Sequence, residues 1–186
     1  MKMLTVWISI LFLLPSEVHD LILSHNTQTP TAFTKGQTTH LHLTKGEKIP
    51  FNKRITEIGA HFDSEGSFIC QTPGLYAFTF HGLTANNWGL WVEMMKNDEL
   101  IASIYAYTHN GYADAGNTAI LHLNVGDKVY LKGHQGSNQT MYGSADQIYT
   151  TFTGELLHPD NVEFKHRKMD HYVVSQQKYI QLVYHY

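Results

Sequence analysis

The chain has 186 residues, of which 42% are hydrophobic, 12% aromatic and only 16% charged, and its formal net charge is −3. This length allows one ordinary domain with terminal segments, and the apolar content is enough for a substantial core. The weak negative charge lacks the basic footprint of a general nucleic-acid-binding surface, so that class is excluded.

The first residues are typical of a secretory signal peptide. Lys2 gives a short basic start, and an apolar or hydroxyl-bearing run over Leu4–Leu14 is broken by Pro15. Such a run is much shorter than the roughly 20 residues of a membrane span, although an uncleaved anchor is the alternative. We expect a signal peptide over 1–19, a linker over 20–30, and a secreted, extracellular protein without a membrane span.

Short strand candidates open the domain that we expect over residues 31–159. They are Ala32–Phe33, His40–Leu43 and Ile49–Phe51. His40 and His42 share one face of their strand, a spacing that suits metal chelation. No third ligand accompanies them, so exposed strand histidines are the alternative.

The stretch Phe62–Phe80 shows the clearest strand pattern. Turns at Asp63–Gly66 and Thr72–Gly74 bound two runs in which alternate positions are apolar. Those positions are Phe68, Cys70, Tyr76, Phe78 and Phe80. A period of two places them on one face of a strand pair, and bulky rings favour a half-buried antiparallel sheet.

Alternating runs continue along the chain, with turn signals at intervals of about ten residues and no helical period. The runs are Trp88–Met94, Leu100–Tyr107, Ala119–Val125, Val129–Leu131 and Tyr149–Leu157. This pattern predicts an all-β fold, an antiparallel two-sheet sandwich or barrel. The predicted core consists of Phe68, Tyr76, Phe78, Phe80, Leu90, Val92, Leu121, Leu123, Val129, Phe152 and Leu156.

Cys70 is the only cysteine, so the chain forms no internal disulfide. Because it lies on the ring-bearing face of its strand, we expect a buried thiol that acts as a small apolar group. The alternative is a disulfide to another chain, since an unpaired cysteine in a secreted protein can bridge subunits.

Two later features concern modification and the terminus. Asn138 begins the only Asn-x-Thr sequon, in a polar loop, which predicts a glycoprotein with a glycan on Asn138. Residues 160–186 mix basic residues with tyrosines, and we expect a poorly ordered C-terminal extension, with binding to anionic surfaces as the alternative.

Catalytic signatures are missing from the sequence. The chain has no Gly-x-Ser-x-Gly elbow, no His-Glu-x-x-His and no phosphate-binding glycine loop. Its 13 histidines are scattered rather than spaced as ligands. We therefore expect no enzyme activity and no catalytic residue.

Several motifs resemble those of the complement C1q globular-head family. They are Phe62-Asp63, Gly66-x-Phe68-x-Cys70, Pro73-Gly74-x-Tyr76-x-Phe78, Lys96-Asn97, Leu121-x-Leu123-x-x-Gly126-Asp127-x-Val129-Tyr130-Leu131 and Thr151-Phe152-Thr153-Gly154-x-Leu156-Leu157. The resemblance implies a C1q/TNF-like jelly roll of about ten strands, shared with tumour-necrosis-factor ligands and assembled as a homotrimer. No Gly-X-Y repeat occurs, so the chain is similar to collagen-less members.

The resemblance also implies a calcium site, because some members bind calcium near the trimer axis through acidic residues before the Leu121 strand. Asp114 matches one of these positions, but Ala106 occupies the place of another. Calcium takes several oxygen ligands, so a site at Asp114 requires oxygens from other chains or from backbone carbonyls. Glu155 stands where the family usually has an aromatic residue.

For function, the resemblance implies a lectin-like, pattern-recognition protein of innate immunity whose trimer binds carbohydrate or microbial surfaces with avidity. Tyr105, Tyr107 and Tyr112 are the candidate ligand-binding platforms for sugar rings, although packing inside the trimer is the alternative. The other function that the resemblance implies is a secreted signalling ligand, similar to cerebellin-like and tumour-necrosis-factor-related members, for a cell-surface receptor.

Overall fold

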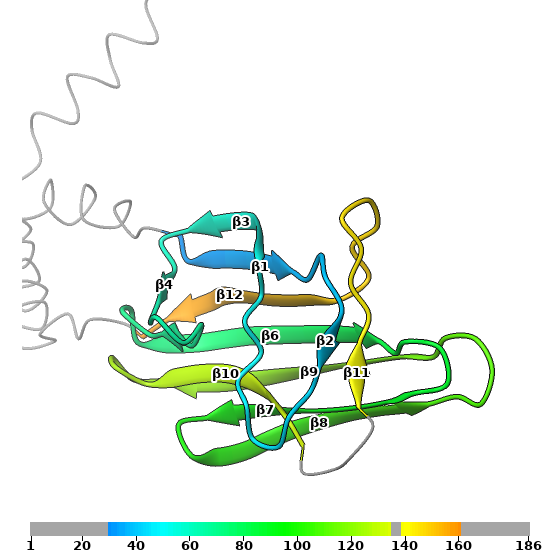
Figure 1. Ribbon diagram of the computed structural model, residues 1–186. Coiled ribbons are helices and arrows are strands. Elements are labelled where there is room, and N and C mark those ends of the chain that lie inside the picture. The colour runs from blue at the N-terminus through cyan, green and yellow to red at the C-terminus, as the bar shows by residue number, and fades with distance from the viewer. Residues whose placement is uncertain (1–29, 135–138, 161–186) are drawn as a thin grey trace, which may run out of the picture.

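The computed structural model describes residues 30–134 and 139–160, and these contain twelve strands and no helix (Figure 1). The strands are β1 (Ala32–Gly36), β2 (Leu41–His42), β3 (Lys53–Ile58), β4 (His61–Phe62), β5 (Phe68–Ile69), β6 (Gly74–Leu83), β7 (Gly89–Lys96), β8 (Glu99–Tyr107), β9 (Asp114–Leu123), β10 (Lys128–Gly133), β11 (Thr140–Met141) and β12 (Thr151–Pro159).

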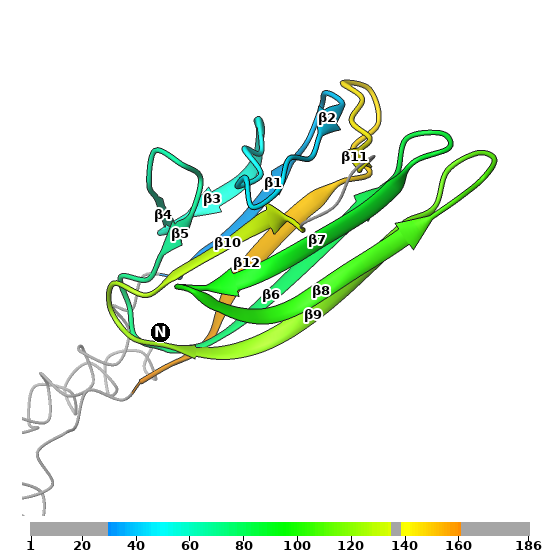
Figure 2. The same ribbon diagram turned by 60° about the horizontal axis from the view of Figure 1, so that its bottom comes forward.

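Ten of the strands form two five-stranded antiparallel sheets, which Figure 2 shows as two layers. Sheet 1 has the order β3-β1-β12-β6-β9, and sheet 2 has the order β4-β5-β10-β7-β8. The remaining pair, β11 and β2, forms a small separate sheet. The prediction of an all-β, antiparallel two-sheet sandwich is confirmed.

Strand β6 lies inside sheet 1, between β12 and β9, and carries the clearest sequence pattern. Along it, side chains alternate between buried and more exposed positions. Tyr76, Phe78 and Phe80 are at most 1% exposed, whereas Leu75 is 39% exposed. The period of two therefore separates core from surface along this strand, as the sequence predicts.

Aromatic rings form the centre of the core between the sheets. The ring centroid of Phe33 lies 5.5 Å from that of Phe68 and 5.1 Å from that of Phe152, and Phe68 lies 5.7 Å from Phe78. Gly154 lets these rings approach, since a Cβ atom there would lie 2.4 Å from the Phe33 ring. Every residue of the predicted core is buried except Leu121 and Leu156, which are partly buried against it.

The prediction of a strand at Ile49–Phe51 is wrong, and the strand lies at β3 instead. The backbone N–H of Ile49 bonds to the carbonyl of Leu131, but Pro50 has no N–H with which to continue a ladder. β3 escaped detection because all six of its side chains are exposed, so its sequence shows no apolar alternation.

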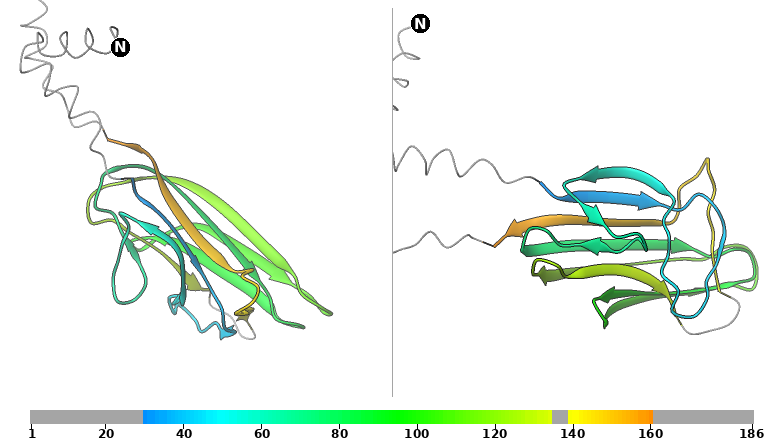
Figure 3. Two further views of the ribbon diagram at one scale, coloured as in Figure 1. Left: turned by 90° about the horizontal axis from the view of Figure 1, so that it is seen from above. Right: turned by 60° about the vertical axis from the view of Figure 1, so that its left-hand side comes forward.

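Both ends of the described chain lie at one end of the sandwich, which we call the base (Figure 3). There the N–H of Leu156 bonds to the carbonyl of Thr31, and the N–H of Asp160 bonds to that of Pro73. The opposite end, which we call the apex, holds the β8–β9 connection and residues 142–150. The segments at the apex therefore lie far from both ends of the described chain.

Candidate functional site

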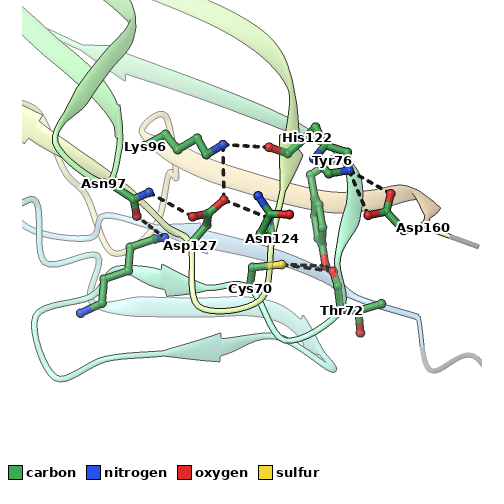
Figure 4. A network of polar contacts seen from close by, with 10 residues as sticks. Cys70, Thr72, Tyr76, Lys96, Asn97, His122, Asn124, Asp127 and Asp160 are labelled. Carbon is green, nitrogen blue, oxygen red and sulfur yellow. Dashed lines mark hydrogen bonds and ion pairs between the residues drawn. The ribbon is translucent and has the colours of Figure 1, made fainter. Parts of the chain in front are cut away.

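Residues that carry the family resemblance form a polar network at the base (Figure 4). Asp127 accepts hydrogen bonds from the side-chain amide of Asn97 at 3.0 Å and from the backbone N–H of Asn124 at 2.9 Å. The ammonium of Lys96 lies 3.3 Å from the same carboxylate and bonds to the carbonyl of His122. These contacts tie the β7–β8 hairpin to the β9–β10 turn, so the motif residues are structural.

The Cys70 thiol is buried beside the same network, as the sequence predicts. Its Sγ donates to the carbonyl of Thr72, which also accepts a 2.6 Å bond from the Tyr76 hydroxyl. Burial raises the pKa of both Cys70 and Tyr76. A thiol that is buried and held protonated is poorly placed for a disulfide to another chain.

Two partly buried carboxylates, those of Asp63 and Asp127, make the base sensitive to acid. Burial alone would raise the pKa of Asp63, but the N–H groups of Ser67 and Glu65 and the ammonium of Lys128 outweigh it and lower that pKa to about 2. For Asp127, the bonds from Asn124 and Asn97 lower the pKa. Both groups are therefore more acidic in the folded chain than in the unfolded one.

Since a lowered pKa favours the folded state only while the carboxylate is charged, the contribution of Asp63 to the free energy of unfolding should be constant above about pH 5 and fall by about 2 kcal/mol as the pH decreases from 5 to 2. Denaturant unfolding at a series of pH values measures this fall. In Asp63→Asn the fall should shrink, with lower stability at pH 7. Asp98→Asn, in the exposed β7–β8 hairpin, is the control and should behave as the wild type.

The three predicted ligand-binding tyrosines are all exposed but do not form one group. Tyr105 is 61% exposed on β8 and lies against Trp91. Tyr107, at the end of the same strand, packs on His109. Tyr112 lies in the β8–β9 connection and packs on Tyr142. The structure thus divides the three between the flank of sheet 2 and the apex.

At the apex, Tyr142 is the centre of an aromatic group that we call the apical cluster. His40, Tyr112 and Tyr149 pack against its ring at centroid distances of 4.4, 5.2 and 5.9 Å, each edge to face. The Tyr142 N–H bonds to the carbonyl of Leu83, which fixes its position. His40 therefore packs on a tyrosine, and its strand neighbour His42 packs on Trp88, so the two do not share a metal-binding arrangement.

On the outer face of sheet 2 lies a second group, the flank cluster, made of Trp91, Glu93, Tyr105, Lys132 and His134. The imidazole of His134 stacks on the Trp91 indole with centroids 3.6 Å apart and planes 14° apart. Tyr105 meets the same indole edge to face at 5.4 Å. Glu93 bonds to His134 Nδ1, and its carboxylate lies 3.4 Å from the Lys132 ammonium.

Tyr105 is the only member of the flank cluster that the sequence marks as a candidate ligand-binding residue. Trp91 and Glu93 alternate on β7 with buried residues, so the sequence indicates that they face outward. It does not indicate which residues of other strands lie beside them. Their neighbours come from β8 and β10, and only the pairing of these strands brings Tyr105 and His134 to Trp91.

Asp114 lies exposed at the start of β9, opposite Leu83. Nowhere in residues 30–134 and 139–160 do three His, Cys, Asp or Glu side chains gather so as to hold a metal. Within the described residues Asp114 therefore has no cluster of acidic or histidine side chains around it, and a calcium site there would need oxygen ligands from backbone carbonyls or from neighbouring chains.

Four predictions concern residues wholly or almost wholly outside the described part of the chain: the signal peptide over 1–19, the linker over 20–30, the glycan on Asn138 and the C-terminal extension over 160–186. They stay predictions. Among the residues that are described, no helix is both long and apolar enough to cross a membrane.

The side chains on the outer face of sheet 1 are mostly small and nearly uncharged, unlike those on the outer face of sheet 2. One rank, meaning a row of residues that pair with one another across neighbouring strands, has a threonine on each of the five strands: Thr56, Thr34, Thr153, Thr79 and Thr118. Within it, the hydroxyls of Thr34 and Thr153 lie 3.1 Å apart and those of Thr79 and Thr118 lie 2.9 Å apart. We call this surface the threonine face.

The rank beside the threonines, toward the base, is largely apolar. It consists of Ile58, Ala32, Glu155, Ala77 and Ile120. Ile58 is 50% exposed and Ile120 is 61% exposed. Flat, apolar and bearing one carboxylate, this surface has the character of a face that another protein surface covers.

The model of the C1q domain family matches residues 32–157. The chain belongs to the C1q domain family. Caprin-2 of zebrafish (Danio rerio) is 36% identical over 154 residues, which are 80% of this chain but 16% of the relative. The chain thus spans a small part of the length of that relative.

Two solved structures support the same fold. The globular domain of zebrafish complement 1qA superposes with a TM-score of 0.56 at 22% identity, covering 70% of this chain and 99% of that one. Eiger TNF from S. frugiperda superposes with a TM-score of 0.56 at 10% identity, covering 73% of this chain and 98% of that one. Both have the C1q/TNF-like jelly roll that the sequence resemblance implies, so this prediction of fold is confirmed.

Proposed function

We propose that this C1q-domain protein is a secreted, trimeric recognition protein of innate immunity that binds carbohydrate on microbial surfaces. The observation that carries the proposal is the set of exposed tyrosines away from the base: Tyr105, Tyr107 and Tyr112 are 52–61% exposed. Tyrosine offers an apolar ring face with a polar hydroxyl, which suits the apolar C–H face and hydroxyl edges of a sugar.

The threonine face supports the trimeric part of the proposal. C1q and TNF-like domains commonly form trimers. The threonine face is a broad surface that carries few charges, which suits contact with another chain. Burying Ile58 and Ile120 between chains would remove exposed apolar area from water. The flank cluster lies on the other sheet, so assembly through sheet 1 would leave it accessible.

A trimer matters because a single sugar-binding surface is usually weak. Three copies of a weak site, held at fixed spacing, engage a repeating polysaccharide with an avidity well above that of one site. Members of the C1q domain family are generally secreted, and the apolar run at Leu4–Leu14 supports the same location for this chain.

Binding to surfaces tests the proposal. The purified protein should sediment with several bacterial species and bind beads coated with polysaccharide, and soluble polysaccharide should compete. Binding to no polysaccharide, together with saturable binding to one cultured cell type, would instead support a secreted signalling ligand.

A further inference from the structure

We infer that the flank cluster is a binding site for neutral hexose units of a polysaccharide. This inference rests on the proposed function and goes further, because it names the surface that holds the sugar and the chemical class of that sugar. The site occupies the outer face of sheet 2, where β10, β7 and β8 run side by side. The site combines three features: a corner of aromatic rings, a fixed carboxylate beside it, and a balanced charge around both.

The corner is formed by Trp91 and Tyr105. Their ring planes stand at 76°, with centroids 5.4 Å apart, so one ring serves as a floor and the other as a wall. Tyr105 is 61% exposed, so much of its ring is open to a ligand. Exposed aromatic area of this kind is a common mark of a binding surface.

His134 and Glu93 hold the corner in place. The imidazole lies flat on the Trp91 indole, and the Glu93 carboxylate bonds to its Nδ1. The side chain of Glu93 is only 12% exposed, and Lys132 contacts its second oxygen. The indole therefore has its orientation set before any ligand arrives, which lowers the entropy that binding must overcome.

The polar groups lie one rank away from the rings. His134, Trp91 and Tyr105 form one rank across three strands, and Lys132, Glu93 and Ser103 form the next. Two residues along a strand span about 7 Å, comparable with the width of a hexose ring. A sugar that stacks its C–H face on Tyr105 would thus direct hydroxyls toward Glu93 and Ser103. A carboxylate has about four lone-pair sites, so Glu93 can accept from a hydroxyl while it keeps its contacts with Lys132 and His134.

The positive and negative side chains on this face are paired with one another, so the surface favours a neutral ligand. Three lysines pair with three carboxylates: Lys48 with Glu65, Lys128 with Asp63 at 3.1 Å, and Lys132 with Glu93 at 3.4 Å. Among the described members of the flank cluster, Lys132 and Glu93 are paired with each other, so neither a sulfated or sialylated chain nor a cationic ligand would find an unpaired partner there. Neutral hexoses, which bind by ring stacking and hydroxyl hydrogen bonds, fit this surface best.

The apical cluster is the competing surface, and its geometry is less suitable. Tyr112, Tyr149 and His40 all direct their packing at one ring, Tyr142, which lies partly buried among them. The polar group bonded to these rings is the side-chain amide of Gln147, whose oxygen accepts a 2.6 Å bond from the Tyr149 hydroxyl, and not a carboxylate such as Glu93.

The test compares Tyr105→Ala with Tyr149→Ala in the full-length secreted protein. Tyr149 is a matched control because it is also an exposed tyrosine, 47% against 61%, but belongs to the apical cluster. The probes are agarose-coupled mannan, β-1,3-glucan particles and, as the charged comparison, heparin-agarose. We expect Tyr105→Ala to bind mannan or glucan at least ten-fold more weakly than the wild type, with Tyr149→Ala unchanged and heparin not bound.

Fluorescence gives a second readout. In Trp88→Phe, Trp91 is the only tryptophan that remains after the expected removal of residues 1–19. Its emission should shift on addition of soluble mannan or laminarin oligosaccharide. Trp91→Phe, which keeps an aromatic floor, should retain part of the binding.

Each other outcome is decisive. If the wild type binds mannan or glucan but Tyr105→Ala binds as well, the site is wrong and the proposed function stands. Loss of binding in Tyr149→Ala instead would place the sugar at the apex. Binding to heparin alone would overturn the neutral ligand, and a wild type that binds none of the three would overturn the proposed function together with this site.

Discussion

Replacing Phe78 by alanine is expected to lower the free energy of unfolding by about 3–5 kcal/mol, the cost of removing a buried aromatic ring and leaving a cavity. Phe78 is fully buried, and its ring contacts those of Phe68, Tyr76 and Phe152 with centroids 5.7–6.1 Å apart. Since a domain is stable by only about 5–15 kcal/mol, the loss takes a large share of the total. Guanidinium unfolding followed by circular dichroism measures it.

The control for this substitution is Val125→Ala, because Val125 is 64% exposed in the turn between β9 and β10. It should change stability by less than about 0.5 kcal/mol. A Phe78→Ala protein as stable as Val125→Ala would show that the aromatic rings do not form the core described above.

Introducing arginine at Thr79 is expected to prevent assembly. Thr79 lies in the middle of the threonine face, paired with Thr153 on one side and Thr118 on the other. In a trimer that buries this face, the substitution would enclose an unpaired charge, which costs several kcal/mol at each interface. Light scattering should show that the mass falls from trimer to monomer, with near-normal circular dichroism.

Ser64→Arg provides the matched control, because it also replaces a small hydroxyl residue by arginine but lies in the exposed turn between β4 and β5. It should keep the mass of the wild type. If Thr79→Arg also keeps that mass, the chains assemble through another surface.

Much of the fold could be predicted because one property repeats along it. Alternation at Phe68, Tyr76, Phe78 and Phe80 marks strands that are buried on one side only, and the inward residues are buried as expected. β3 was missed for the converse reason: it lies at an edge of sheet 1 with every side chain exposed, so no alternation remains to detect.

The candidate site could not be predicted in the same way. The motifs that reveal the family, such as Lys96-Asn97 and Gly126-Asp127, hold the hairpins of the base together and contact no candidate ligand surface. Tyr105 was found because it is an aromatic residue near a polar loop, but its partners Trp91 and His134 are distant in sequence. Strand register, which depends on the whole sheet, decides that these three meet.

The proposal of a trimeric recognition protein is tested most directly by its solution mass. Light scattering measures this mass for the full-length secreted protein, with and without a calcium chelator. We expect three times the mass of the glycosylated monomer, unchanged by the chelator, because in the proposed trimer the threonine face, rather than a metal, would join the chains. A monomer mass would contradict assembly and remove the avidity on which recognition depends. Dissociation by the chelator alone would show instead that calcium, bound between chains near Asp114, holds the trimer.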